Sequence, residues 1–298
     1  MSTPAGNGSL LSRIEDLRKI PTIPAVLAPL LRYLQRPAEQ MDMHEVTDMI
    51  SQDKSLAAQC LQMANSPLFG KWQKIDSLKG AIVGLGMQRV SDIVTCCGVL
   101  NLAPKDTAGI DPIVFWEHSL GCALLCRHFA RKISYPDPGK AYLAGLLHDI
   151  GIIVNLWTLP NEFRTAFERA RAQGSPLSES ELAMLGFTHC ESGHLLARKW
   201  ELSTDLCDVI SLHHSRYESS AYAPLVALVS ISDLLCRMSG LGYGFMERRE
   251  VNVLEEPGFV SLSQQCPALK DFDWARLTFE LDSYMDEVHT LVHAIYRK

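Results

Sequence analysis

The residues of this sequence that could do chemistry are histidines and aspartates placed at helical spacing. An adjacent pair, His148-Asp149, stands in the stretch Leu146-Leu147-His148-Asp149-Ile150-Gly151. The same residue types recur on what read as further helices, at His118, His189, His213, His214 and Asp233. Imidazole and carboxylate together suit first-row transition metals, and iron, manganese, zinc and nickel all fit this donor set.

These seven groups lie on five predicted helices, and a helical bundle can project such ligands inward onto one centre. We therefore expect a pocket that holds one or two divalent transition metals. Two metals bridged by an aspartate and held about 3.5–4 Å apart would activate water and bind a phosphoryl oxygen. This is the physical basis for a hydrolase, and Asp149 is the catalytic candidate if the chain is an enzyme.

The same residue types also have an ordinary structural interpretation. A histidine on an apolar helix face is usually a hydrogen-bonded core residue, and we assign that role to His44, His128, His194, His289 and His293. Asp149 differs from these because an unpaired buried carboxylate in an apolar helix is costly. On the residues alone, a metal or anion site and a buried polar network stay equally open.

The elements that position these residues are predicted to be helices. Apolar residues recur at helical spacing throughout the chain, and strand-like alternation is scarce. We expect helices over Pro112–Phe129, Pro160–Gln173 and Trp274–Tyr296, with a boundary between two helical lobes near Asn101–Asp111. Gly151 is expected to allow a helix stop or a close backbone approach. The segment Leu78–Val94 resembles a helix-turn-helix, but a corner between two packed helices is favoured.

Composition and charge limit the classes of partner and the cellular compartment that we expect. The formal net charge of -6 offers no basic face for nucleic acid, so DNA or RNA is not expected. Nine cysteines without a CxxC pair indicate buried free thiols in a reducing compartment. The first residues lack the pattern of a secretory signal, and no uninterrupted apolar run reaches the ~18 residues that span a bilayer. We therefore expect a cytoplasmic protein without a membrane partner.

At this point the motifs resemble a known family. One set is similar to the HD superfamily of metal-dependent phosphohydrolases: Trp116-Glu117-His118-Ser119, Leu146–Gly151, Gly186-Phe187-Thr188-His189, His213-His214 and Asp233. A second set resembles the HDOD domain, the HD-related output domain of bacterial signalling proteins: Ile20–Pro24, Asp53, Asn65–Gly70 and Ala81–Gly86. The resemblance covers roughly Ser12 to Gly240. Stand-alone chains of this family include response-regulator-type proteins of about this length, one of them from a methane monooxygenase regulatory cluster.

The resemblance implies an all-α fold in which an N-terminal helical lobe packs on an HD-like helical lobe. The implied divisions are a disordered start at 1–11, an N-terminal lobe at 12–105, an HD-like lobe at 106–240, and a loop with a C-terminal helix at 241–298. The related HD-GYP phosphodiesterases use the same ligand order, which implies metal ligation by all seven residues. The chain departs from them at Ile152, where they supply a lysine, and in lacking their Gly-Tyr-Pro triplet.

Two functions follow as hypotheses. The first is a signal-transduction output or regulatory module of the HDOD type that acts through protein interactions with signalling proteins, gated by bound metal or a small phosphate-containing ligand. The alternative is a metal-dependent phosphodiesterase acting on a nucleotide or cyclic dinucleotide. Loss of a cation that contacts the scissile phosphate removes several kcal/mol of transition-state stabilisation, so the missing lysine favours the module.

Overall fold

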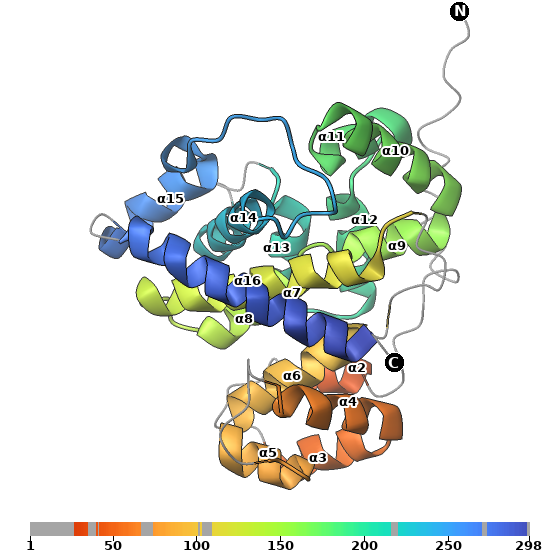
Figure 1. Cartoon of the computed structure of the whole chain (residues 1–298), viewed down its shortest axis with the longest axis vertical. Coiled ribbons are helices and arrows are strands. Elements are labelled where there is room, and N and C mark those ends of the chain that lie inside the picture. Colours follow the sequence, from red (N-terminus) through yellow and green to blue (C-terminus); the bar gives the residue numbers. More distant parts are fainter. Residues whose placement is uncertain are drawn as a thin grey trace, which may run out of the picture.

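The computed structural model describes residues 27–34, 40, 42–66, 74–100, 102, 109–215, 220–269 and 273–296. Every regular element within these ranges is a helix, which confirms the predicted all-α class. Figure 1 shows α2 to α6 gathered in one lobe and the later helices in a second, larger lobe, with α16 running along the second lobe toward the first. The expected disordered start and the extended segment Ile20–Pro24 lie outside the described residues.

Within the described residues, the first lobe contains five short helices: α2 (Leu27–Leu34), α3 (Met43–Ser51), α4 (Lys54–Ala64), α5 (Leu78–Leu85) and α6 (Met87–Leu100). Asp53 caps α4 by accepting hydrogen bonds from the backbone N–H of Ser55 and Leu56 at 2.9 and 3.1 Å. All residues from Val90 to Leu100 are buried, so α6 is a core helix. This agrees with a packed corner between α5 and α6, because a DNA-reading helix must expose one face.

The second lobe holds the candidate ligands and contains these helices: α7 (Pro112–Lys132), α8 (Pro138–Leu147), α9 (Ile150–Thr158), α10 (Pro160–Gln173), α11 (Leu177–Leu185), α12 (His189–Lys199), α13 (Thr204–Leu212), α14 (Ala223–Met238), α15 (Pro257–Gln265) and α16 (Trp274–Tyr296). Two short 3₁₀ turns flank α15, at Val253–Glu255 and Pro267–Leu269. The expected helices over Pro160–Gln173 and Trp274–Tyr296 are found with those bounds, and the one from Pro112 continues to Lys132.

Two glycines bring the ligand-bearing helices into close contact. A Cβ on Gly145 of α8 would lie 2.8–2.9 Å from Cys126 Sγ, Ala123 Cα and the Cys122 carbonyl oxygen of α7. A Cβ on Gly151 of α9 would lie 1.8 Å from the His189 carbonyl oxygen of α12. Gly151 therefore permits a close backbone approach and does not end a helix, since α9 runs through it.

The lobes are joined by a buried ion pair. Arg127 of α7 places Nη1 2.6 Å from Asp92 Oδ2 of α6, and both side chains are at most 9% exposed. The Arg127 guanidinium also lies 4.0 Å from the ring centroid of Tyr142 in α8. One apolar core continues across both lobes, with Val46 and Ile93 on one side and Leu120 and Leu228 on the other.

The most apolar stretch and the cysteines lie inside the protein. Pro138–Thr158, which comprises α8 and α9, is long and apolar enough to span a bilayer, but 94% of its most apolar 18-residue window is buried within the structure, as in a core helix. Eight of the nine cysteines are buried free thiols and Cys266 is half-buried, which confirms the expectation for their side chains.

Candidate metal centre

The structure brings all seven predicted ligands to one place in the second lobe. They come from five points of the chain: His118 in α7, His148 and Asp149 at the break between α8 and α9, His189 at the start of α12, His213 and His214 just after α13, and Asp233 in α14. Six of them are at most 1% exposed, and only the His214 side chain reaches 22%. Helix α8 ends at Leu147 and α9 begins at Ile150, although Leu143, Leu146, Leu147 and Ile150 form one apolar helical stripe in the sequence.

The Asp149 carboxylate lies between two pairs of histidines. Its Oδ1 is 3.1 Å from His189 Nε2 and 3.4 Å from His213 Nε2. Its Oδ2 is 3.3 Å from His118 Nε2 and 3.2 Å from His148 Nε2. Each carboxylate oxygen therefore faces its own cluster of donor atoms, as a bridging ligand between two cations would.

The other two ligands complete the two clusters. Asp233 Oδ1 is 3.3 Å from His118 Nε2 and joins the His118–His148 side. His214 joins the side of His189 and His213, with its ring centroid 4.2 Å from that of His213. Within each cluster, all candidate donor atoms lie within 4.8 Å of one another.

The backbone fixes which ring nitrogen faces the centre. Nδ1 of His118, His148 and His213 donates to the carbonyl oxygens of Leu241, Gly145 and Val209 at 2.6, 2.7 and 3.1 Å. These bonds turn the Nε2 atom of each ring toward Asp149. A hydrogen bond on the outer nitrogen is the usual support of a metal-bound histidine, because it fixes the tautomer and ring orientation.

His189 has a stronger support, the buried carboxylate of Glu181 in α11. Glu181 Oε2 is 2.6 Å from His189 Nδ1 and accepts from the His189 backbone N–H at 2.9 Å. Its other oxygen accepts from the Asn155 amide at 3.1 Å. Burial lowers the pKa of His189, but the Glu181 charge outweighs burial and raises it well above the ordinary value.

The donor set fits a cation. His118 and His148 bring their Nε2 atoms within 3.3 Å, and His189 and His213 do so at 3.4 Å, so a proton or a metal ion must separate the lone pairs. Asp149 Oδ1 is buried without a well-aligned hydrogen bond. Burial lowers the pKa of His118, yet the facing aspartates raise it to about 10. The centre thus attracts positive charge strongly, although its role as a metal site stays a prediction.

Two side chains compete with a metal for the aspartates. Arg237, one turn after Asp233 on α14, bonds both Asp233 oxygens at 2.8 and 2.9 Å and also pairs with Glu247. Tyr243 donates its hydroxyl to Asp149 Oδ2. The cluster of His118, His148 and Asp233 is therefore partly neutralised by the protein itself, whereas the side of His189 and His213 is free of such competitors among the described residues.

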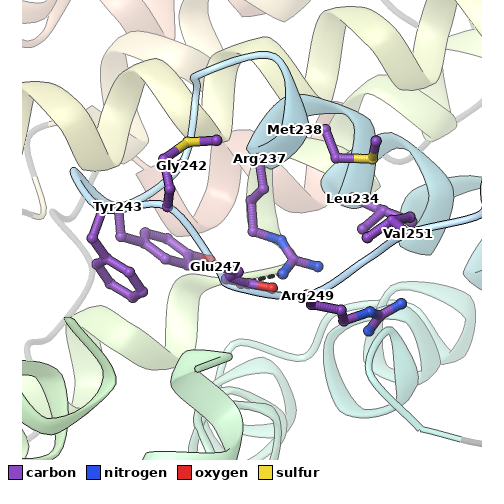
Figure 2. Close-up of a pocket in the computed structure, with 10 residues that line it drawn as sticks. Leu234, Arg237, Met238, Gly242, Tyr243, Glu247, Arg249 and Val251 are labelled. Carbon is purple, nitrogen blue, oxygen red and sulfur yellow. Dashed lines mark hydrogen bonds and ion pairs between the residues drawn. The ribbon is translucent and has the colours of Figure 1, made fainter. Parts of the chain in front are cut away.

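Tyr243 belongs to a segment, residues 240–251, that we call the cover segment. It follows α14 and passes over the centre, with Gly240 and Gly244 at φ of +90° and +83°, values that favour glycine. Figure 2 shows Tyr243 and Glu247 on this segment, with Arg237 of α14 paired to Glu247. Arg248 N donates to the Gly174 carbonyl oxygen at 2.7 Å, which ties the segment to the end of α10.

Two cavities flank the cover segment. One, of about 210 Å³, reaches the partly exposed His214 and is also lined by Arg237, Tyr243 and Arg249, together with the first turn of α11. The other, of about 200 Å³, is more apolar and lies among Leu234, Met238 and Phe245 (Figure 2). His214 is thus the ligand through which a small solute could approach the centre.

Sequence reasoning missed three residues of the centre: Glu181, Arg237 and Tyr243. Arg237 carried a signal, because it stands four residues after Asp233 and shares its helix face. Glu181 stands in the acidic stretch Ser178-Glu179-Ser180-Glu181, which does not suggest burial, and its partners Asn155 and His189 lie on other helices. Ile152, the position of the missing lysine, is fully buried in α9 and supplies no charge to the centre.

The comparisons with known proteins show the family. The HDOD domain model matches residues 20–216, which is most of the chain, and the chain belongs to this family. An HDOD domain protein of unknown function from Geobacter sulfurreducens has the same fold, with 26% identity, a TM-score of 0.81, and coverage of 97% of this chain and 98% of that one.

Two further structures share the fold at lower identity. A candidate phosphohydrolase from Shewanella amazonensis has 22% identity and a TM-score of 0.72, with coverage of 96% and 100% of the two chains. A candidate signal transduction protein from Marinobacter aquaeolei has 18% identity and a TM-score of 0.77, with coverage of 98% and 66%. The MmoQ response regulator of Methylococcus capsulatus also matches, with 18% identity, coverage of 83% of this chain and 93% of that one, and a TM-score of 0.43.

An uncharacterised protein of Treponema pallidum is 24% identical over 238 residues, which are 77% of this chain and 44% of the relative. The chain spans less than half of the length of the curated relatives it matches.

Proposed function

We propose that this chain is a signal-transduction output module that acts through protein contacts and is gated by occupancy of its His/Asp centre. Membership of the HDOD family supports a signalling role. The observation that carries the gating is the direct bonding of the cover segment to candidate ligands. Leu241 accepts from His118, Tyr243 donates to Asp149, and Glu247 holds the arginine that neutralises Asp233.

The cover segment could signal to a partner protein whether the His/Asp centre is occupied, because apolar side chains on and beside the segment are exposed. Met246 is 67% exposed, Leu254 55% and Met238 45%. Exposed methionines are frequent at adaptable protein-binding surfaces. A cation at the centre would compete with Tyr243 and Arg237 for the two aspartates, so occupancy and the position of this segment are coupled. A divalent metal is the first candidate, and the cavity with Arg237 and Arg249 suits a small phosphate-containing ligand.

Hydrogen exchange with and without added Mn²⁺ or Zn²⁺ tests the gating. We expect exchange over residues 240–251 to change when metal binds, while the buried residues 90–100 of α6 keep theirs. Tyr243→Phe should take up metal about tenfold more tightly, because it removes a charge-assisted hydrogen bond that the metal must replace. Tyr222→Phe, an exposed tyrosine, is the matched control. Metal uptake without any change over 240–251 would contradict the gating.

The phosphodiesterase alternative is favoured by one observation, the Asp149 carboxylate with each oxygen facing a separate histidine cluster. When bound there, two metals would supply an activated water and neutralise a phosphoryl group. This chain would contribute the bridging carboxylate and the rigid histidine frame, with Arg237 and Arg249 near a small anion at His214. Tyr243 would have to leave Asp149 first.

Turnover of a generic phosphodiester such as bis-p-nitrophenyl phosphate with added Mn²⁺ separates the two functions. Activity that is lost in Asp149→Ala and kept in Glu168→Gln, a change of an exposed carboxylate on α10, would establish the enzyme. Absence of turnover in protein that contains metal would leave the signalling module as the function.

A further inference from the structure

A second cluster of metal-type ligands lies where α16 packs on α7, and its α7 residue is the neighbour of His118. Glu117 of α7 meets His289 and His293 of α16, with Glu117 Oε1 2.6 Å from His289 Nδ1 and 3.5 Å from His293 Nε2. The three candidate donor atoms lie within 4.8 Å of one another. The sequence assigned both histidines a structural role, because only the packing of α16 on α7 brings Glu117 to them.

The Glu117 carboxylate needs a positive partner at this place. Its side chain is only 7% exposed, and within the described ranges its ion-pair partners are these two histidines. A buried carboxylate without positive charge beside it is costly, and a cation shared with the two imidazoles offsets that cost. His289 and His293 are four residues apart on one helix, so their rings project from the same face one turn apart.

We propose that Glu117, His289 and His293 form a second divalent-metal site, of the zinc type, that fastens α16 to α7. Two histidines and a glutamate are an established zinc donor set, which leaves a fourth position for water. That position is open here, since the two histidine side chains are 46% and 38% exposed. The metal at this site exchanges with solvent more readily than one at the buried centre.

The placement of the site gives it a structural consequence. Glu117 is the neighbour of His118, so a metal held by Glu117 steadies the turn of α7 that carries a ligand of the buried centre. Helix α16 packs along α7 and also contacts α4 of the first lobe. A metal at this site therefore restrains the helix that spans both lobes (Figure 1).

Zinc titration of the chelator-treated full chain, followed by calorimetry, tests the site. We expect His289→Ala and His293→Ala each to remove one exchangeable zinc ion per chain, or to weaken its binding by at least about tenfold. The matched control is His128→Ala. His128 also joins α7 to α16, through Glu280 at 2.9 Å and Tyr284 at 3.2 Å, but it belongs to no group of three metal-type ligands among the described residues. This control should keep the full stoichiometry.

Hydrogen exchange of α16 gives a second readout. Zinc should slow exchange over residues 285–296 in the wild type and not in His293→Gln, a variant that keeps the size and polarity of the side chain. Equal zinc stoichiometry and affinity in the wild type and in folded His289→Ala would overturn the proposal, and the cluster would then be a hydrogen-bonded contact. Because Asp149→Ala affects only the buried centre, it should retain this zinc ion whether or not the gating proposal holds.

Discussion

A carboxylate buried as completely as that of Asp149 is stable only when positive charge surrounds it. Four imidazole Nε2 atoms and the Tyr243 hydroxyl supply that environment. Burial alone raises the pKa of Asp149, but the facing histidines hold it well below its ordinary value. The residue is therefore ionised, and any ion that enters the centre meets a fixed negative charge.

Glu181→Gln tests the support of His189 at the scale of one residue. The change removes the negative charge that lies 2.6 Å from His189 Nδ1, so Nε2 of this ring becomes a weaker ligand for a metal ion. Metal affinity should fall by about 10–100-fold, as for other supports of metal-bound histidines. Competition with a fluorescent chelator measures the affinity. Glu168→Gln, on the exposed face of α10, should leave it unchanged, and an equal loss in both variants would contradict the role of Glu181.

The meeting of the seven candidate residues at one centre could be predicted, because histidine and aspartate are unusual on apolar helix faces. Glu181 could not, because its stretch of sequence is acidic and its buried partners, Asn155 of α9 and His189 of α12, come from other helices. Tyr243 and Leu241 stand in a glycine-rich stretch that was expected to be a plain loop. Their roles depend on a hydroxyl and a backbone carbonyl reaching across about a hundred residues of chain, which local spacing does not encode.

At the scale of elements, the centre depends on how closely α9 approaches α12. Gly151 lies against the backbone of the helix that begins with His189, and Gly193 on α12 lies against Gly151 in turn. A capping box between Thr188 and Glu191 fixes the start of α12, so His189 keeps its position. The spacing of these helices sets the distance between Asp149 and His189.

Gly151→Ala should destabilise the protein, because the new Cβ would lie 1.8 Å from the His189 carbonyl oxygen and the helices must separate. Overpacking of this kind costs about 1–3 kcal/mol, and occasionally more, in the free energy of unfolding. Gly84→Ala in α5 is the control, since nothing lies within 4 Å of its Cβ. It should stabilise by up to about 1 kcal/mol. Urea unfolding measures both, and an undiminished stability of Gly151→Ala would refute the close approach.

The contact between α8 and α13 predicts a pH dependence. Lys140 Nζ lies 2.5 Å from Asp205 Oδ2, and burial raises the pKa of Asp205 less than the Lys140 and Ser203 hydrogen bonds lower it. A carboxyl with a depressed folded-state pKa stabilises above its unfolded pKa and loses that contribution as pH falls through the folded one. Asp205→Asn should therefore lower the free energy of unfolding by about 1 kcal/mol near neutral pH. The difference between variant and wild type should shrink as the pH falls below about 4.

Urea unfolding of the wild type and Asp205→Asn at several pH values measures this difference. Asp282→Asn, on the exposed side of α16, serves as the control for the substitution itself. If the variant and the wild type differed in free energy of unfolding by the same amount from neutral to acidic pH, the charge of Asp205 would not stabilise the fold.

At the scale of the molecule, the two lobes share one core and the Asp92–Arg127 pair crosses between them. Arg127→Met leaves the Asp92 charge buried without its partner, which costs about 3–5 kcal/mol in the free energy of unfolding. The control is Arg32→Met, which removes an exposed cross-lobe pair with Glu201 and should cost less than about 1 kcal/mol. Chemical denaturation measures the free energy of unfolding of both variants. A similarly small decrease in both would show that the buried pair does not hold the lobes together.

Most of the fold could be predicted from the sequence, because helical periodicity and the proline and glycine positions mark the helices of the second lobe well. The bounds of α10 and α16 were found as expected. The break between α8 and α9 was not predicted, since the apolar stripe continues through it without proline. The approach of α16 to Glu117 was not predicted either, because contacts between distant helices are set by packing.

The presence of metal at the centre is the central claim, and metal content measured by mass spectrometry tests it most directly. The protein would be purified without chelator or affinity nickel, beside Asp149→Ala checked for fold by circular dichroism. We expect one or two more bound metal ions per chain in the wild type than in the variant. Equal metal content in the two, with no difference after iron, manganese or zinc is added, would contradict the claim and leave the histidines as a buried polar network.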